Sequence, residues 1–450
     1  MLRFSTNFLS KRCLSTFGYA QLGSRSVVKV SGPDATKFVN GLITSKMIPH
    51  ASKRLAMTIE EGPEQELTLG EFDMSKNWGI LLESPETTNQ TVSRLGIYTM
   101  FLNSKGRIIT DAWIYPGFKP SENEYMKQDA EYFIETDSSI MNQLTMMFKL
   151  HKLRSKVSFA PVQDVNVWAC YNDNQMDALY DIQQEYVDLE STSLKTPEAA
   201  HKNVQSFQRS SFFQESIDDK ITAFAFDNRV PDSGIRLVLP KGVTPTQVIS
   251  EDYLPEGSEI SADEFNTRRA LFGVPEVPSD ITPNKFLPLE CNLEYMGGVN
   301  FDKGCYTGQE LTVRTFHTGV VRKRVVPVRI FLLPTDTSEL PLELNSQDPV
   351  CGCVPKGQWN ITSDKEEENQ SFVSSPFGGS SAKAARSRAK AMRSSGTLLS
   401  TYHNIGLALV RLEDFADPST NFFVDIPGAG DGNKNLMLGI KAYIPYWWPE

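Results

Sequence analysis

Hydrophobic and polar positions alternate over short distances in the first part of the chain, and their period changes from segment to segment. An apolar run over 26–30 is strand-like and leads through a Gly-Pro-Asp turn into a helix. The apolar stripe of that helix consists of Ala35, Phe38, Val39 and Leu42. Two further strand-like runs, 98–102 and 108–115, are joined by Asn-Ser-Lys-Gly, which predicts a hairpin.

The period keeps changing toward the middle of the chain. A strand-like run over 131–137 precedes an amphipathic helix within 138–157, and another strand follows over 164–171. Residues 58–94 are acidic and polar without a clear period, so we expect a loop or insertion there. Residues 172–218 are polar, and we expect irregular or helical structure. Strands, helices and hairpins in this order predict an α+β fold.

The last part of the chain is rich in strand-like runs. Before it, Ser261 can cap a helix that Gly273 ends. From 325 onward, apolar runs separated by turns predict a separate small β-barrel or sandwich. Within it, residues 361–395 place an acidic run before a run of Ser, Ala, Lys and Arg with few large apolar groups. Such a segment buries too little to order itself, so we expect a disordered loop.

Length and charge limit the class of protein. A chain of 450 residues is long enough for two or three domains. No run approaches ~18 consecutive apolar residues, so we expect no membrane span. The formal net charge of -10 argues against stable nucleic-acid binding, which relies on positive charge.

The N-terminal residues have the composition of a targeting segment. Arg3, Lys11 and Arg12 are basic, Ser and Thr are interspersed, and the first acidic residue is Asp34. A helix here would be basic and amphipathic, and the segment lacks the continuous apolar core of a secretory signal. These features predict a mitochondrial presequence over 1–18 and a location in the mitochondrial matrix. A basic tail without a targeting role is the alternative.

Cysteine usage singles out one thiol. Six cysteines are scattered without a disulfide framework, which suits a reducing compartment. Cys351 and Cys353 form a C-G-C pair, either on one face of a strand or as part of a metal site. Cys305 lies in K-G-C-Y-T-G-Q-E, two residues after Lys303. A nearby cation and a helix starting at Thr307 or Gly308 would favour the reactive thiolate form.

The sequence is compatible with three roles for Cys305: a nucleophile, a ligand of a metal ion or cluster, or a turn residue that merely packs. One cysteine cannot hold zinc or an iron–sulfur cluster alone, because such sites take about four ligands. Cys291 and His317 are the nearest additional ligand types, but their spacing matches no standard closed site. A ligand position shared with a partner protein fits a lone thiol better.

The segment around Cys305 resembles a known signature. Residues 288–314, P-L-E-C-N-L-E-Y-M-G-G-V-N-F-D-K-G-C-Y-T-G-Q-E-L-T-V-R, are similar to the K-G-C-Y-x-G-Q-E motif of the YgfZ-like branch of the aminomethyltransferase (glycine-cleavage T-protein) superfamily. G-P-D-A-T-K-F-V-N-G-L-I-T-S-K-M, F-L-N-S-K-G-R-I-I-T-D-A-W-I-Y and F-D-N-R-V-P-D-S-G-I-R-L-V-L resemble further parts of that family. The likeness covers most of 20–330 and part of the tail.

The resemblance implies a fold and a division into domains. The family has a ring of two α+β domains and a β-barrel around a central channel, with a folate-binding pocket. We therefore expect folate-binding aminomethyltransferase-like domains over 19–324, with the motif at 303–310. A C-terminal β-barrel would follow over 325–450.

The resemblance also implies a function and its residues. A mitochondrial member of this branch is expected to assist maturation of [4Fe–4S] proteins, of the aconitase type and radical enzymes. It would act with A-type scaffold partners and recipient apoproteins, and Cys305 would bind iron or a transient cluster shared with the scaffold. The expected frame of that site consists of Lys303, Gln309, Glu310 and Arg314.

Three residues are candidates for binding tetrahydrofolate. Asp111 occupies the stretch where the transferases carry a folate-activating aspartate, although a strand-end hydrogen-bond acceptor is an equal alternative. Arg229 and Arg236 can meet the glutamate tail of a folate. Arg236 can instead pair with Asp227 or Asp232 and fix its loop.

Two rival functions remain open. A tetrahydrofolate-dependent aminomethyl or one-carbon transferase would need Asp111 and could dispense with Cys305, since that chemistry needs no protein thiol. A folate-binding partner of RNA modification is the other rival. The acidic net charge disfavours direct RNA binding in that case.

Overall fold

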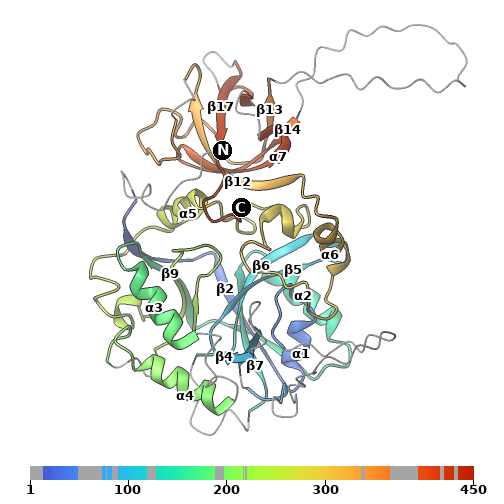
Figure 1. Cartoon of the computed structure of the whole chain (residues 1–450), viewed down its shortest axis with the longest axis vertical. Helices are drawn as coiled ribbons and strands as arrows, with labels where there is room; N and C mark the ends of the chain where they lie inside the picture. Colours follow the sequence, from blue (N-terminus) through green and yellow to red (C-terminus); the bar gives the residue numbers. More distant parts are fainter. Residues whose placement is uncertain are drawn as a thin grey trace, which may run out of the picture. The chain divides into compact units, whose positions relative to one another are not determined.

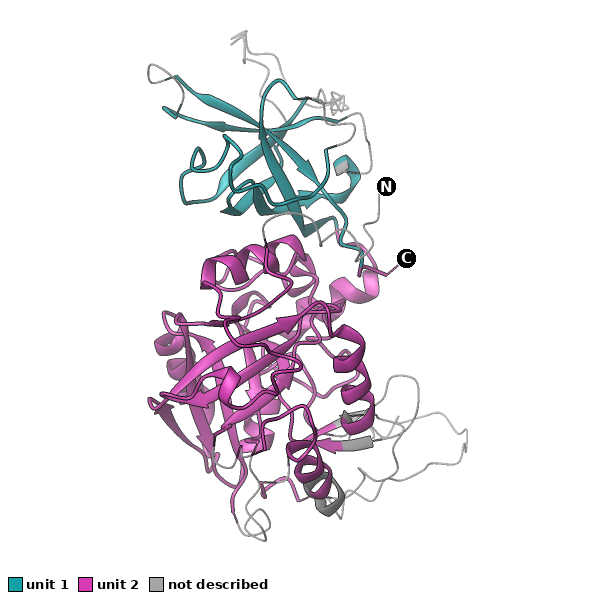
Figure 2. Cartoon of the chain, turned by 90° about the vertical axis from the view of Figure 1, so that its left-hand side faces the viewer, with its two compact units in different colours: residues 1–13, 322–446 teal, residues 14–321, 447–450 magenta. Residues whose placement is uncertain are grey.

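The described residues form two compact units (Figure 2). The computed structural model describes residues 14–48, 73–77, 79–83, 90–118, 128–187, 197–215, 217, 220–335, 340–364, 394–415, 420–429 and 434–449. The larger unit, called the core unit, contains 14–321 and the residues from Trp447 onward. The smaller unit, called the barrel unit, contains 322–446. The division falls at Arg322, whereas we predicted a boundary after Arg324.

The first sheet of the core unit is five-stranded and antiparallel (Figure 1). Its strands in spatial order are β5 (Ile97–Leu102), β6 (Ile108–Tyr115), β7 (Glu131–Asp137), β2 (Arg25–Ser31) and β8 (Ser158–Val162). Helices α1 (Ala35–Asn40) and α2 (Met141–Lys152) pack together and on this sheet. Phe148 of α2 contacts Phe38 of α1 and Phe101 of β5, at ring separations of 5.9 and 5.7 Å. The hairpin and both helices match the apolar periods of the sequence.

The second sheet of the core unit has four antiparallel strands. In spatial order they are β1 (Phe17–Gln21), β9 (Val165–Asn172), β11 (Ile235–Pro240) and β10 (Ala223–Phe226). Phe207 of α4 packs against Phe224 and Phe226 of β10, together with Phe212 and Phe213 of the following turn. This aromatic cluster is the centre of the apolar core beside this sheet.

Two predictions about the core unit need correction or refinement. Residues 58–94 were expected to form a loop, but β3 (Ile80–Glu83) and β4 (Gln90–Ser93) pair as an antiparallel hairpin. Residues 58–72 lie outside the described residues. The polar stretch 172–218 is helical in part, with α3 (Met176–Val187) and α4 (Pro197–Gln208).

The predicted presequence overlaps the folded chain. Strand β1 starts at Phe17 and pairs with β9, and the Ser15 amide donates to Glu264 Oε1 at 2.8 Å. The Asp173 amide donates to the Thr16 carbonyl. Cleavage as far along as Tyr19 would remove part of a paired strand, so a boundary before Ser15 agrees better with these contacts. The processing site stays a prediction, and residues 1–13 lie outside the described residues.

The connections after β11 position the candidate site. Helix α5 (Ala262–Leu271) begins as expected at Ser261, whose Oγ accepts the Glu264 amide at 3.1 Å. Two 3₁₀ turns, η3 (Pro245–Gln247) and η4 (Pro288–Cys291), flank it in sequence. Helix α6 (Gln309–Thr318) then ends the core unit before the chain enters the barrel.

The barrel unit is a closed, antiparallel, six-stranded barrel. Its strands in spatial order are β12 (Lys323–Leu332), β15 (Ile405–Arg411), β14 (Ser394–Tyr402), β13 (Trp359–Ser363), β16 (Phe422–Ile426) and β17 (Leu436–Ala442). A short helix, α7 (Leu412–Phe415), follows β15. The predicted loop was drawn too wide, because 361–363 belong to β13 and 394–395 to β14. Residues 365–393 lie outside the described residues.

The α+β class and the C-terminal barrel are confirmed by these sheets. A ring around a central channel depends on how the two units are arranged, and it stays a prediction. None of the helices in the described residues has the length and apolar character needed to cross a bilayer.

Candidate functional site

Cys305 lies on an exposed loop that leads into α6 (Figure 1). Both Gly304 and Cys305 are exposed, and a Cβ added to Gly304 would meet no atom within 4 Å. The helix begins at Gln309 instead of Thr307 or Gly308. Cys305 therefore precedes the first residue of α6 by about one helical turn in sequence, and its thiol is exposed to solvent.

A glycine contact fixes this loop against the β5–β6 hairpin. Gly308 has φ +76°, and a Cβ there would lie 2.3 Å from the Asn103 carbonyl oxygen and 3.2 Å from Gly106 Cα. The Thr307 amide also donates to the Gly41 carbonyl at 3.2 Å. The second glycine of the motif is thus required by close backbone approach and positive φ.

Lys303 has a structural role that the sequence prediction missed. Its Nζ donates three hydrogen bonds of 2.7 Å, to the carbonyls of Asn40, Ile43 and Ser45. These carbonyls lie at and just beyond the C-terminal end of α1, where backbone acceptors lack helical partners. Burial lowers the pKa of Lys303 to about 7, and repulsion from Lys46 adds to this, while the three carbonyls bind the ammonium form. Lys303 was expected in the frame of the Cys305 site, and its ammonium group instead clamps the end of α1.

The other predicted frame residues divide into two kinds. The Gln309 Oε1 accepts the Tyr306 amide at 3.1 Å and so ties the start of α6 to the loop. Glu310 and Arg314 are one turn apart on α6 and both are exposed. Among the described residues neither of them forms an ion pair with the other or with Lys303. They belong to the surface around Cys305 rather than to its support.

The described part of the chain offers no closed metal site. No group of three or more His, Cys, Asp or Glu side chains in it is arranged to hold a metal ion. Cys291 is fully buried, and burial raises the pKa of its thiol well above the ordinary value, so it cannot join Cys305 as a surface ligand. Exposed His317 lies near the opposite end of α6. Cys305 supplies a single ligand from this region.

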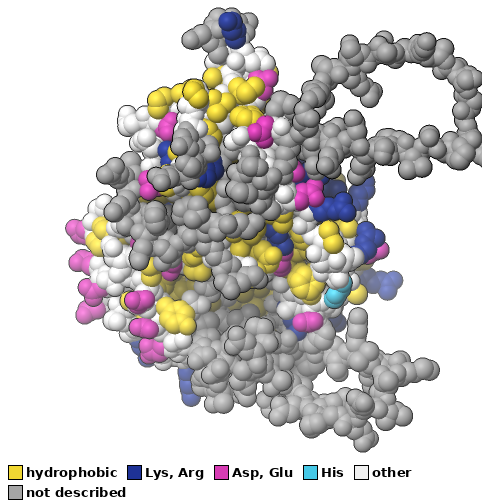
Figure 3. Space-filling view, turned by 45° about the horizontal axis from the view of Figure 1, so that its top comes forward, with side chains coloured by type: hydrophobic (Ala, Val, Ile, Leu, Met, Phe, Trp, Pro, Cys, Tyr) yellow, Lys and Arg dark blue, Asp and Glu magenta, His cyan; other side chains and the backbone are white. Residues whose placement is uncertain are grey.

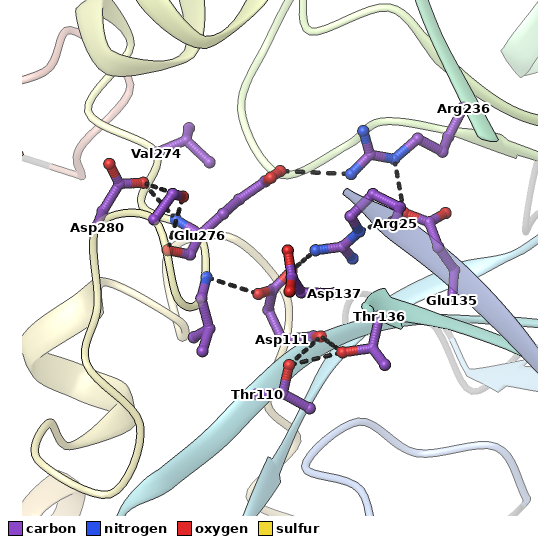
Figure 4. A network of polar contacts seen from close by, with 12 residues as sticks. Arg25, Thr110, Asp111, Glu135, Thr136, Asp137, Arg236, Val274, Glu276 and Asp280 are labelled. Carbon is purple, nitrogen blue, oxygen red and sulfur yellow. Dashed lines mark hydrogen bonds and ion pairs between the residues drawn. The ribbon is translucent and has the colours of Figure 1, made fainter. Parts of the chain in front are cut away.

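The folate candidate Asp111 lies in a buried network of ion pairs (Figure 4). Its Oδ1 accepts the Val277 amide at 2.8 Å, and its Oδ2 pairs with Arg25 Nη1 at 2.9 Å. Arg25 also donates to Glu135 at 2.8 Å. Side chains from β6, β7 and β2 of one sheet and β11 of the other point toward one another here. The network joins the two sheets of the core unit, and both Asp111 oxygens are engaged in it.

The two candidate arginines belong to the same network. Arg229 pairs with Asp227 and Glu276, each at 2.7 Å, and Arg236 reaches Glu276 at 3.3 Å and Glu135 at 3.4 Å. The predicted pairing of Arg236 with Asp227 or Asp232 is thus replaced by two carboxylates distant in sequence. Burial would raise the pKa of Glu276, but the arginines around it, Arg269 foremost, hold that pKa well below its usual range.

A hollow beside Arg229 is the second feature that the sequence prediction missed. It has a volume of about 280 Å³ and is lined in part by Tyr98, Trp113, Asn228 and Asn300. The Arg229 guanidinium lies over both aromatic rings, 5.2 Å from Tyr98 and 5.6 Å from Trp113. The Tyr98 hydroxyl and the Trp113 Nε1 are buried and have no hydrogen-bond partner within the described part of the chain. The strand-like runs 98–102 and 108–115 predicted the hairpin that carries both rings, but not their unpaired polar atoms.

The donor set of this hollow fits part of a folate. Unpaired O–H and N–H groups beside aromatic rings suit a flat heteroaromatic ring such as a pterin. Arg236 has no exposed surface and is already neutralised by carboxylates, so it does not fit the glutamate tail. A second hollow of about 450 Å³ shares Asn228 and Arg229 with the first.

Comparison with known proteins gives close relatives over nearly the full chain. A protein of Meyerozyma guilliermondii named "Iron-sulfur cluster assembly factor IBA57 homolog, mitochondrial" is 36% identical, over 95% of this chain and 98% of its own. Proteins with the same name from Candida albicans and Scheffersomyces stipitis are 35% and 33% identical, over 96% of this chain and 98% of theirs. Those names place the relatives in the mitochondrion, as predicted here from the N-terminal sequence.

Two further comparisons concern the C-terminal barrel and the whole chain, respectively. Residues 322–450 match the family model described as the CAF17 C-terminal beta-barrel domain. The crystal structure of an aminomethyltransferase T of the glycine cleavage system from Bartonella henselae is similar with a TM-score of 0.48 and 10% identity. That likeness covers 96% of this chain and 86% of the other. On the near full-length identity to its relatives, the chain belongs to the IBA57 family of mitochondrial iron–sulfur cluster assembly factors.

Proposed function

We propose that this chain assists the maturation of mitochondrial [4Fe–4S] proteins in the matrix, with Cys305 as one ligand of a cluster shared with an A-type scaffold. The observation that carries the proposal is an exposed thiol on a fixed loop with no second ligand beside it among the described residues. The names of the relatives support the assembly role.

A single ligand suits transfer better than storage. An iron–sulfur cluster is held by about four protein ligands, so one thiolate leaves most positions to the scaffold or the recipient. A cluster that is only partly bound to this chain can leave it by exchange of one bond. Recipient apoproteins of the aconitase or radical-enzyme type would supply the replacing ligands.

The supports of the loop agree with this role. Lys303 and Gly308 hold the backbone on both sides of Cys305, while the thiol and Gly304 stay open. A ligand shared between two proteins must be presented at a defined position before the partner binds, because ordering a mobile loop would reduce affinity. Glu310 and Arg314 are then available to contact the partner.

We also propose that the hollow beside Arg229 binds the pterin ring of a folate. Support comes from the unpaired Tyr98 hydroxyl and Trp113 Nε1 and from the guanidinium over both rings. When bound, a tetrahydrofolate would supply one-carbon chemistry, and the chain would contribute ring orientation. Because a folate-dependent transferase must bind folate, variants of the residues that line this hollow can test the transferase alternative.

The test of the cluster role replaces Cys305 by Ser in cells that lack the wild-type gene. We expect aconitase activity per aconitase protein to fall, because the ligand is lost while the loop supports remain. Cys353→Ser, a half-buried cysteine of the barrel unit, is the matched control and should leave activity unchanged. Full aconitase activity with Cys305→Ser would refute the proposal.

The transferase alternative needs a variant other than Asp111→Ala, which would disrupt buried ion pairs. Tyr98→Phe removes one unpaired hydroxyl and leaves the network intact. We expect weaker tetrahydrofolate binding, measured by calorimetry, with normal aconitase activity. Loss of aconitase activity with Tyr98→Phe, together with a healthy Cys305→Ser strain, would assign the function to folate chemistry.

A further inference from the structure

Helix α2 carries apolar side chains on two opposite faces. Leu144, Met147 and Phe148 are buried in the core unit. Met146 and Leu150 on the other face are 64% and 66% exposed, and Leu153, directly after the helix, is 87% exposed. Spacings of four and three place these three residues on one line. Packing on a core needs only one apolar stripe, so folding does not account for the second.

The sequence around this stripe is basic, in contrast to the chain as a whole. Lys149, Lys152, Arg154 and Lys156 lie between Met141 and Val162, and that stretch contains no Asp or Glu. The whole chain has a formal net charge of -10. The face shown in Figure 3 likewise carries acidic side chains along its left edge and basic ones mainly along its right edge. Charge is therefore unevenly distributed over this acidic protein.

Leu153 stands out within the stripe. It has φ +42°, a conformation that residues other than glycine seldom adopt, and its side chain is held in solvent. An open hollow of about 670 Å³ beside it is lined by Asp34, Lys37, Phe38, Leu153, Arg154 and Ser155. Asp34, the only carboxylate among the described residues of that lining, accepts the Lys156 amide at 2.7 Å. Lys37 of α1 thus extends the basic rim on the far side of the hollow.

We propose that Met146, Leu150 and Leu153, with Lys37, Lys149, Lys152 and Arg154 around them, form a docking surface for an anionic lipid membrane. This set is called the α2 patch. Its aliphatic side chains would enter the boundary between headgroups and acyl chains, while the Lys and Arg head groups would meet lipid phosphates. Long basic side chains can place their apolar stems along the membrane surface and keep their charges at the phosphates.

The composition of the α2 patch favours lipid over a protein partner. The centres of protein interfaces are rich in aromatic and Arg side chains that fill pockets. The α2 patch instead has exposed, flexible aliphatic side chains along one helix face, with an open hollow at Leu153 and mainly Lys around them. Apolar insertion combined with several basic residues is the usual pair of signals for reversible membrane attachment.

The α2 patch lies away from the Cys305 loop. Thr307 of that loop contacts Gly41 at the C-terminal end of α1, whereas Lys156 contacts Asp34 at its N-terminal end. The Cys305 loop and the segment that follows α2 thus contact opposite ends of α1. The inference does not depend on the role proposed for Cys305.

The test measures sedimentation of the purified chain with vesicles of phosphatidylcholine alone or with cardiolipin. Arg3, Lys11 and Arg12 are replaced by Gln in all proteins, so that the basic N-terminus does not contribute. We expect binding to the cardiolipin vesicles only, weakened by salt. Leu150→Glu together with Lys149→Glu should weaken binding about tenfold or more, because both signals are lost.

Controls separate the α2 patch from general effects. Met437→Glu changes an exposed apolar residue of the barrel unit and should leave vesicle binding unchanged, as should Cys305→Ser. Thermal unfolding of each variant checks its fold. Equal binding by wild type and the double variant would overturn the proposal. Absence of binding to cardiolipin vesicles would also overturn the proposal. Capture of an acidic protein by a crosslinker at Leu150, without vesicle binding, would assign the α2 patch to a protein partner instead.

Discussion

Two regions of the core unit contain the reactive and charged candidates, and they differ in burial and in pairing. Around Cys305, the thiol, Glu310 and Arg314 are exposed, and backbone contacts together with Lys303 and Gln309 hold the loop. Around Glu276, charged side chains have almost no exposed surface and neutralise one another. Charges that satisfy each other inside a protein mainly specify the fold, whereas an exposed group on a fixed support is free to meet a partner.

This difference in burial and pairing changes which residues are candidates for binding folate. Asp111 and Arg236 were selected by position in a motif, but each is fully buried and paired. Tyr98 and Trp113, which no motif singled out, have buried polar atoms without a hydrogen-bond partner among the described residues. The proposed folate site therefore rests on these two side chains instead of on Asp111 and Arg236.

The largest expected effect concerns Glu276→Gln. The change leaves buried Arg229 and Arg236 without their shared carboxylate, and we expect the free energy of unfolding to fall by about 3–5 kcal/mol. Urea unfolding measures this loss. Glu310→Gln, an exposed match on α6, should change stability by less than about 0.5 kcal/mol. Similar losses for both variants would remove the distinction between the two regions.

The pH dependence of stability in Glu276→Gln tests whether the buried carboxylate is ionised in the folded protein. The folded-state pKa of Glu276 lies below its unfolded value, so its contribution to stability is present at neutral pH. That contribution is lost as pH falls below about 4.3, the usual Glu value, toward the folded pKa. Glu276→Gln should therefore lose less stability than wild type on acidification. A parallel fall in both proteins would show that Glu276 is not held ionised.

Lys303→Met is expected to have the next largest effect. Three carbonyls at the end of α1 lose their donor together, which should cost about 2–4 kcal/mol of unfolding free energy. Lys105→Met, an exposed lysine on the neighbouring hairpin, is the control and should be close to neutral. If Lys303→Met unfolds like wild type, the clamp does not support the Cys305 loop.

Gly308→Ala tests the backbone support more locally. Positive φ and the close Asn103 carbonyl predict a loss of about 1–3 kcal/mol. Gly304→Ala, where an added Cβ meets nothing within 4 Å, should cost less than about 1 kcal/mol. Thermal unfolding of the pair measures both. Equal losses would mean that the close backbone contact and the positive φ of Gly308 do not distinguish it from Gly304.

The sequence was sufficient to predict those elements whose structure depends on residues close to one another along the chain. The hairpin of β5 and β6, helix α1 and the cap at Ser261 follow from local period and turn chemistry, and the barrel follows from repeated apolar runs. The β3–β4 hairpin was missed because its few buried apolar residues, among them Ile80, Leu81 and Val92, stand within a stretch that is otherwise mostly polar.

Pairings across long sequence distances could not be predicted in the same way. Glu135 and Glu276 lie far in sequence from Arg236, so no local pattern assigns them to it. Likewise, Lys303 was expected to act on the adjacent thiol, but its acceptors come from the other end of the core unit's sequence. Cys305 itself was found because its motif is local.

The smallest expected effect on stability concerns Cys305 and separates function from folding. Cys305→Ser changes an exposed side chain, so the free energy of unfolding should stay within about 0.5 kcal/mol of wild type. Cys291→Ser places a hydroxyl in a buried site and should cost about 1–3 kcal/mol. Urea unfolding of the two variants, combined with aconitase activity in cells, then distinguishes the two cysteines. A Cys305→Ser protein that is as stable as wild type but inactive would assign the thiol to transfer. If instead its activity loss followed a stability loss, as expected for Cys291→Ser, Cys305 would be a packing residue.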